Sequence, residues 1–223
     1  GSDRNPGTKD RPFATLDRAR RAVRALRRSG TGGDIRVFFR GGMYLLKKPV
    51  VFSLDDSAPD GCRTIYCAYG REQPVLSGGV LVTDWTSPRM LPHGFPPAAK
   101  GNVWCAPLPD GIDSCSTLYA GAIRLPRARG KGFVPERSQS WRSEDQTVMR
   151  VPEGAVQNWS RLREAELVLV TAAPWTMNIL PVKSVDEKNR ILRTAIPGTY
   201  ALAAPMFGPF EESAWIENLP QFM

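Results

Sequence analysis

The sequence predicts a mainly β protein that begins with one α-helix. Gly and Pro number 20 each in 223 residues, and this abundance of turn formers suits short strands joined by tight turns. Only residues 15–28 combine apolar residues at helical spacing with capping residues at both ends. Hydrophobic residues make up 42% and charged residues 23%, which excludes a chain that is disordered throughout. The apolar runs are also far too short to span a bilayer.

The predicted helix at residues 15–28 has an apolar stripe and a basic face. Thr15 suits the N-cap, and Ser29 with Gly30 suits the C-terminal end. The stripe consists of Ala19, Ala22, Val23 and Leu26. The basic residues are Arg18, Arg20, Arg21, Arg24, Arg27 and Arg28. A solvated helix face is the simplest interpretation of these arginines.

The chain is basic, with a net charge of +8 and a pI near 9.6. A basic excess suits nucleic acid, anionic polysaccharide or membrane headgroups. Residues 18–28 contribute much of it, but no aromatic side chains alternate with these arginines to stack on bases. We therefore expect no nucleic-acid partner and no membrane partner.

After the helix, the sequence changes to short strands separated by Gly, Pro or Asp clusters. No second helix lies between them, so the usual βαβ crossover is absent. This pattern of short strands and tight turns favours coils of a parallel β-helix as much as a β-sandwich. The predicted strands are residues 35–39, 44–46, 50–52, 64–68 and 74–76.

A second region, from Trp85 to about Pro209, alternates Pro-rich loops with strands. Residues 182–185 and 191–194 predict a hairpin, and we expect a separate antiparallel β-sandwich or barrel domain. The other predicted strands are residues 117–119, 147–151, 166–171, 178–180 and 213–219. The predicted domains are residues 1–83, 84–210 and 211–223.

Several motifs in the first region resemble a known family. They are Asn5-Pro6-Gly7-Thr8, Pro12-Phe13-Ala14-Thr15-Leu16, Ile35 to Tyr44, Asp56-Ser57, Ile65 to Gly70, and Pro74 to Gly79 leading to Trp85. This succession is similar to the N-terminus of right-handed parallel β-helix glycoside hydrolases. The most similar group is the bacterial families that include β-xylosidases and the fucosidase/xylanase-type enzymes of pectin breakdown.

The resemblance implies the first coils of a β-helix, capped by the helix, and an inserted antiparallel domain. Leu118-Tyr119, residues 124–129 and 184–186 resemble the insertion, and residues 215–219 resemble the return to the β-helix. Such proteins continue for several hundred residues, so we expect an N-terminal portion of a secreted or periplasmic enzyme. The missing β-helix, or a partner chain, is expected to dock on an apolar surface formed by Trp215, Ile216, Leu219 and Phe222.

A glycosidase needs two carboxyl groups across the scissile bond, about 5–5.5 Å apart for retention and about 6.5–9.5 Å apart for inversion. The acids of the first region, Asp55, Asp56 and Asp60, share the single turn at 53–61. A solvated turn that caps its own backbone explains them best, and a calcium site is the alternative. We therefore assign no catalytic residue, and the resemblance places the acids downstream. The chain alone is expected to hydrolyse nothing.

Two pairs of residues are candidates for binding an oligosaccharide or polysaccharide. Arg127 and Arg129 lie in a Gly/Pro-containing loop, and guanidinium groups pair with carboxylates such as those of a uronate. Surface charge, or internal pairing with Glu136 or Glu144, is the alternative. Trp141 and Trp175 are candidate platforms for a pyranose ring, and partly buried tryptophans of the domain core are the alternative.

No metal or other cofactor is predicted. The four cysteines form two loose pairs, Cys62 with Cys67 and Cys105 with Cys115, neither with CxxC spacing. The single His93 cannot complete a Cys/His zinc site. A disulfide between Cys105 and Cys115, across a Pro/Gly/Asp-rich turn, stays open.

The leading functional prediction is a glycosidase that degrades plant-type or acidic polysaccharide. Two alternatives remain. One is a polysaccharide lyase on the same scaffold, which would form unsaturated products, often with calcium. The other is a carbohydrate-binding or adhesin module that binds glycan without turnover.

Overall fold

The computed structural model describes residues 1–91, 93–142 and 145–223. The chain forms two compact units, Gly1–Leu81 (unit 1) and Val82–Met223 (unit 2). Unit 1 holds the N-terminal helix and four strands, and unit 2 holds an antiparallel sheet. The three-domain division expected from the sequence stays a prediction.

Unit 1 begins with helix α1 (Leu16–Arg28), so the helix predicted from the sequence is confirmed. The Thr15 hydroxyl accepts a hydrogen bond from the Arg18 amide at 3.1 Å, which satisfies one of the free donors of the first turn. Ala19 and Val23 of the predicted stripe are buried, but Leu26, in the last turn, remains exposed.

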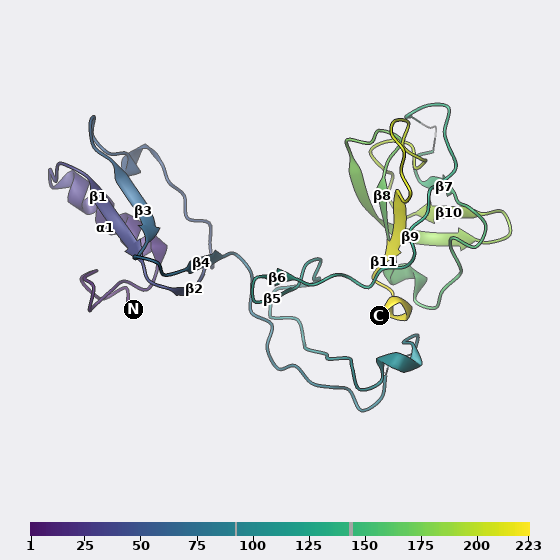
Figure 1. Ribbon diagram of the computed structural model, residues 1–223, viewed down its shortest axis with the longest axis horizontal. Helices are drawn as coiled ribbons and strands as arrows, with labels where there is room; N and C mark the ends of the chain where they lie inside the picture. The colour runs from purple at the N-terminus through teal and green to yellow at the C-terminus, as the bar shows by residue number, and fades with distance from the viewer. Residues whose placement is uncertain (92, 143–144) are drawn as a thin grey trace. The chain divides into compact units, whose positions relative to one another are not determined.

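The strands of unit 1 pair in parallel, as predicted. Strand β1 (Ile35–Phe39) pairs with β3 (Thr64–Ala68), and β2 (Gly42–Leu45) pairs with β4 (Pro74–Ser77) (Figure 1). Each of the two sheets has two strands. Along the chain, β1, a turn and β2 form a first layer, and β3, a turn and β4 form a second. Each strand of the second layer pairs with the corresponding strand of the first.

One predicted strand of unit 1 is wrong. Residues 50–52 form no strand, and the chain there leads into the short 3₁₀ helix η1 (Leu54–Asp56). Pro49 directly precedes them and has no amide hydrogen to give to a ladder. No neighbouring strand of unit 1 pairs with this segment.

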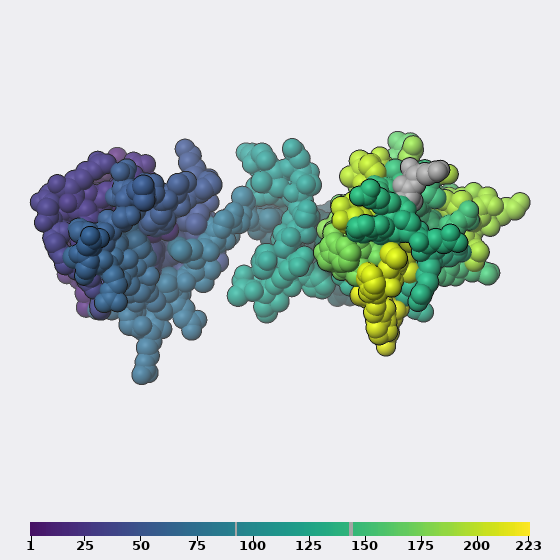
Figure 2. Space-filling view, turned by 90° about the horizontal axis from the view of Figure 1, so that it is seen from above, coloured from purple at the N-terminus to yellow at the C-terminus, as the bar shows by residue number. Residues whose placement is uncertain are grey.

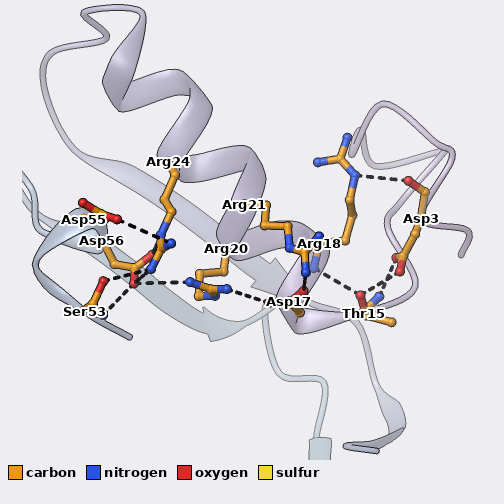
Figure 3. Close-up of polar contacts among 10 residues, drawn as sticks. All are labelled: Asp3, Thr15, Asp17, Arg18, Arg20, Arg21, Arg24, Ser53, Asp55 and Asp56. Carbon is orange, nitrogen blue, oxygen red and sulfur yellow. Dashed lines mark hydrogen bonds and ion pairs between the residues drawn. The ribbon is translucent and has the colours of Figure 1, made fainter. Parts of the chain in front are cut away.

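The acidic turn before β3 is solvated and self-capped, as expected, except at Asp56: Asp55 is 61% exposed and Asp60 is exposed, whereas Asp56 faces α1 (Figure 3). Asp56 caps its own turn by accepting the Ser53 amide at 2.8 Å. Its carboxylate also accepts two hydrogen bonds from Arg24 of α1, at 2.5 and 2.6 Å, and Arg20 lies 3.5 Å away. The Asp56 side chain is only 5% exposed. The hydrogen bonds from Arg24 lower its pKa to about 2.

This salt bridge ties α1 to the loop between the two layers of strands. The basic face of α1 is therefore only partly solvated: Arg20 and Arg24 are held against Asp56, whereas Arg21 and Arg28 remain exposed. The calcium alternative is also disfavoured, because two guanidinium groups already neutralise the most buried carboxylate of the turn.

Unit 2 is built on one five-stranded antiparallel sheet in the order β11-β8-β9-β10-β7 (Figure 1). The strands are β7 (Val148–Arg150), β8 (Glu166–Val170), β9 (Met177–Asp186), β10 (Ile191–Thr194) and β11 (Ala214–Glu217). The predicted β9–β10 hairpin is confirmed.

Strand β9 connects the two halves of this sheet. Its residues 177–181 pair with β8, and its residues 182–186 pair with β10. The ladder to β10 is irregular between Arg193 and Thr194, and such bulges bend a sheet. Strands β7 to β11 thus form one bent antiparallel sheet, and the sandwich or barrel form expected from the sequence stays a prediction.

One face of this sheet carries the main core of the protein. Alternation along β8 turns Leu167 and Leu169 to the same face. Both leucines are fully buried and belong to one hydrophobic cluster with residues of the other strands. Further fully buried members are Met149, Leu192, Ile216 and Leu219.

The predicted docking surface at the C-terminus is wrong for Ile216 and Leu219, since both lie in this core. Phe222 packs edge-on against Trp159, with ring centroids 5.6 Å apart. In Figure 2 the yellow C-terminal segment starts against the green segments of the same unit and extends past their lower edge. The tail completes unit 2 because its apolar side chains complete the hydrophobic face of the sheet.

The outer edge of β11 is also covered. Residues 129–133 run beside it, and the amides of Gly130 and Phe133 donate to the carbonyls of Ile216 and Ala214, both at 2.8 Å. This edge of β11 is therefore paired, which removes the backbone groups that a further strand would use.

The first part of unit 2 contains little regular structure. A short hairpin of β5 (Tyr119–Ala120) and β6 (Ile123–Arg124) is its main element. Cys105 forms an isolated antiparallel bridge with Thr86. All four cysteines of the protein are free thiols, so no disulfide links Cys105 to Cys115. Within the described ranges, no helix has the length and apolar character needed to cross a membrane.

Candidate functional site

The structure brings together the two tryptophans predicted to bind sugar and adds a third aromatic side chain. Trp141 and Trp175 lie with ring centroids 6.2 Å apart at 71°. Tyr200 stacks on Trp141, at 5.7 Å and 7°, and meets Trp175 edge-on, at 6.3 Å and 77°. We call these three residues the aromatic corner.

The rings of the aromatic corner remain open to solvent. Trp175 is 63% exposed and Trp141 is 43% exposed, so neither is the partly buried core tryptophan of the alternative interpretation. Tyr200 is half-buried. Exposed aromatic surface costs free energy unless a ligand or partner covers it, because its apolar area stays in contact with water.

Backbone hydrogen bonds hold the loops that carry these rings. The Ala201 amide donates to the Trp141 carbonyl at 2.8 Å, and the Ala172 amide donates to the Ala201 carbonyl at 3.3 Å. Ala172 and Ala201 are themselves buried with Ala203 in a small apolar cluster. The loops before β7, before β9 and after β10 are therefore held together by backbone hydrogen bonds and by this buried alanine cluster.

Side chains add two further links. Asn178 of β9 donates to the Thr199 hydroxyl at 3.0 Å and accepts from the Thr199 amide at 2.8 Å, which fixes the backbone next to Tyr200. The hydroxyls of Thr171 and Thr176 lie 2.7 Å apart, so one donates to the other, and each lies 3.0 Å from the Ala173 carbonyl, which accepts from the second. These bonds close the β8–β9 turn that carries Trp175.

Arg127 has internal partners, although not those considered from the sequence. Its Nη1 atom lies 2.5 Å from Glu166 Oε2 and 3.5 Å from Glu217 Oε2, and its side chain is only 17% exposed. Glu166 and Glu217 face each other across the β8–β11 ladder. Their like charges would repel, and Arg127 compensates them.

Arg129 completes the same cluster. Its Nε donates to Glu217 Oε1 at 3.1 Å, and its guanidinium lies 4.2 Å from the ring centre of Trp215. The Trp215 indole donates to the same Glu217 oxygen at 2.8 Å. Because both guanidinium groups already pair with the buried Glu217 carboxylate, and Arg127 also pairs with the partly exposed Glu166, the cluster suits a structural role. A role in binding an acidic sugar stays a prediction.

The carboxylates proposed as alternative partners lie elsewhere or are not described. Glu136 pairs with Arg190 at 3.3 Å, and Glu144 lies outside the described residues. Sequence spacing could not identify Glu166 and Glu217, because the sheet register of β8 and β11 brings them to Arg127.

The hollows of the described residues do not present a pair of free carboxylates. One of about 520 Å³ in unit 2 is lined in part by Asp186 and Glu187, but Asp186 accepts two hydrogen bonds from Asn189 and Glu187 accepts the Asn158 amide at 2.7 Å. A hollow of about 940 Å³ in unit 1 is lined mainly by apolar residues of α1, β1 and β2, and no Asp or Glu belongs to its lining. In the ranges that the structure describes, no group of three or more His, Cys, Asp or Glu side chains could hold a metal ion. The aromatic corner is therefore the best candidate for a binding site.

Comparison with solved structures finds a protein described as "Glycoside hydrolase". The two share a TM-score of 0.75 at 24% sequence identity, over 98% of this chain and 38% of that chain. This likeness shows a common fold for part of that protein. The chain spans well under half the length of its match. No family model matches the chain, and no curated protein matches it.

Proposed function

We propose that this chain is the N-terminal part of a secreted or periplasmic bacterial glycoside hydrolase that acts on plant-type or acidic polysaccharide. The aromatic corner in unit 2 would bind the glycan, and the catalytic carboxylates would lie outside this chain. The observation that carries the proposal is the clustering of Trp141, Trp175 and Tyr200 as exposed rings in a chain that shares its fold with part of a glycoside hydrolase.

We also propose that unit 1 forms the first coils of a right-handed parallel β-helix, with α1 as the cap of this helix. Two stacked strand–turn–strand layers support it, because β1 pairs in parallel with β3 and β2 with β4. Within unit 1, β3 and β4 each have one edge without a strand partner. A further parallel coil would pair there, so we propose these edges, instead of the C-terminal tail, as the place where the β-helix continues.

Aromatic rings suit a glycan because one face of a pyranose ring is lined with C–H groups. Such a face stacks on indole or phenol and removes apolar area from water, while the sugar hydroxyls stay at the rim. The loops of the aromatic corner are held by the bonds of Ala201, Asn178 and Thr199. Binding would therefore cost little ordering entropy.

Binding to soluble xylan and pectic polysaccharide in affinity gel electrophoresis tests this proposal. We expect Trp175→Ala to weaken retardation by about tenfold or more, as truncation of a central aromatic does in other interfaces. Trp104→Ala is the matched control, because Trp104 is 60% exposed and lies outside the aromatic corner.

Three outcomes separate the alternatives. No retardation by any glycan would overturn the proposal. Binding without turnover, even when the rest of the protein is present, would favour the adhesin-type module. Unsaturated products formed by the longer protein would favour the lyase.

A further inference from the structure

The aromatic corner has a geometry that no flat surface can match. The ring planes of Trp141 and Trp175 meet at 71°, and those of Trp175 and Tyr200 meet at 77°. Trp141 and Tyr200 are nearly parallel, but they stack on each other instead of lying side by side. Tyr200 covers part of the Trp141 ring, and the Arg142 guanidinium lies 5.8 Å from the centre of that ring. The ring surface that remains open on Trp175 and on the Trp141–Tyr200 stack therefore lies in two planes roughly at right angles.

This geometry discriminates between forms of polysaccharide. The surface of a crystalline polysaccharide is flat, so a binding site needs coplanar rings to use more than one aromatic side chain on it. The successive sugars of a single dissolved chain turn relative to one another, and they can present one face to Trp141 and the next to Trp175. The ring arrangement excludes simultaneous stacking of both tryptophans on a flat crystal face.

We infer that the aromatic corner binds single, soluble glycan chains and not crystalline polysaccharide, and that Tyr200 is a binding-site residue that sets this preference. The inference rests on the proposed function, and it adds the physical form of the ligand. Tyr200 acts by holding the ring of Trp141 through stacking, so that Trp141 stays roughly perpendicular to Trp175.

The packing beneath the rings makes the angle between them a fixed property. The Ala201 amide, next to Tyr200, is bonded to the Trp141 carbonyl, and Thr199, on the other side of Tyr200, is bonded to Asn178 of β9. The turn that carries Trp175 is closed by the Thr171 and Thr176 hydroxyls. These bonds fix the backbone beneath the rings, so flattening the corner requires the side chains to rotate, which would break the stacking of Tyr200 on Trp141 and the edge-on contacts of Trp175.

The experiment compares two probes with the same intact chain. Xylohexaose in solution is titrated by isothermal calorimetry, and microcrystalline cellulose is used in a pull-down assay at matched protein concentration. We expect binding to the oligosaccharide and no more depletion by cellulose than Trp175→Ala, which lacks one ring of the corner, shows. A soluble pectic oligomer serves as a second dissolved probe.

Three variants separate the ring geometry from general folding. Trp141→Ala and Tyr200→Ala should each weaken oligosaccharide binding by about tenfold, whereas Tyr200→Phe keeps the ring and should bind as wild-type does. Near-ultraviolet circular dichroism and the unfolding midpoint of each variant show whether unit 2 remains folded. Loss of binding in a folded Tyr200→Ala variant supports the inference.

The outcomes for the two proposals are distinct. Binding to cellulose as strong as to the dissolved probes, or unchanged oligosaccharide affinity in Tyr200→Ala, would overturn the inference and leave a carbohydrate-binding function in place. Absence of binding to both dissolved probes and to cellulose would overturn the proposed function itself.

Discussion

The two units of this protein are stabilised in different ways. Unit 2 buries a continuous hydrophobic cluster on one face of a five-stranded sheet. Unit 1 buries only four apolar residues, Leu16, Ala19, Val23 and Phe39, and its strands leave Phe38, Met43 and Val75 about half exposed. Ion pairs also hold α1 to the turn before β3 in unit 1, through the contacts of Arg24 and Arg20 with Asp56.

The net positive charge lies almost wholly in unit 1, whereas the main hydrophobic core lies in unit 2. Residues 1–81 contain 15 Lys and Arg against 8 Asp and Glu, a net charge of +7 out of the +8 of the whole chain. In unit 2 the opposite charges nearly balance, and its most buried ion pairs join strands of one sheet. Unit 2 therefore builds a closed core of its own and still leaves aromatic side chains such as Trp175 exposed, whereas unit 1 has few buried apolar side chains and has strand edges that a further pair of strands would cover.

The largest expected effect concerns the two cores, probed with the same substitution. Leu167→Ala in unit 2 should cost about 3 kcal/mol, because the fully buried site cannot collapse around the cavity. Leu16→Ala in unit 1 should cost less, about 2 kcal/mol, since Leu16 borders the open hollow beside α1. Urea unfolding with hydrogen-exchange mass spectrometry assigns each loss to its unit, and equal losses would contradict the comparison.

A nearly equal effect is expected for the buried ion pairs of unit 2. Arg127→Ala removes the ion-pair partner of Glu166 and leaves Arg129 as the one guanidinium beside the two facing carboxylates, and should cost about 3 kcal/mol. Arg129→Ala should cost about 1 kcal/mol or less, because this side chain is 52% exposed.

The Arg127→Ala, Glu217→Gln double variant provides the control. Removing one of the two carboxylate charges should restore part of the stability lost in Arg127→Ala. If Arg127→Ala instead melts as wild-type does and loses affinity for an acidic oligosaccharide, Arg127 is a binding residue and the structural interpretation fails.

A smaller effect is expected for the salt bridge of unit 1. Arg24→Ala removes both hydrogen bonds to the buried Asp56 carboxylate and should destabilise unit 1 by about 2 kcal/mol. Arg21→Ala is the matched control on the same helix, and should cost about 0.5 kcal/mol or less because Arg21 is exposed. Exchange protection of α1 and β3 reports the difference, and indistinguishable variants would show that the salt bridge does not hold the layers.

The pH dependence of stability tests the same contact between Asp56 and Arg24. The pKa of Asp56 is about 2 in the folded chain, below its value of about 3.9 in an unfolded chain. The resulting stability, about 2 kcal/mol, is fully present above about pH 4 and is lost as pH falls toward 2. The stability difference between wild-type and Asp56→Asn should shrink over this range in acid titrations, and a constant difference would argue against a depressed pKa.

Local sequence features were enough by themselves to specify the N-terminal helix and several strands of this protein. The Thr15 cap with the apolar spacing of Ala19 and Val23 specified α1, and the apolar runs at 35–39 and 64–68 specified β1 and β3 with the bounds that the structure shows. The exposed candidates Trp141 and Trp175 could also be named, because tryptophans in polar, Pro- or Ser-flanked loops stand out from the core pattern.

Tertiary structure alone decided the partners. The register of β8 against β11 brought Glu166 and Glu217 to Arg127, and loop packing brought Tyr200, an isolated tyrosine with no sequence signal, onto Trp141. It also buried Ile216 and Leu219, which the sequence placed on an open surface. The physical reason is that capping and hydrophobic periodicity depend on neighbours within a few residues, whereas ion pairs, ring stacking and burial depend on segments up to ninety residues away.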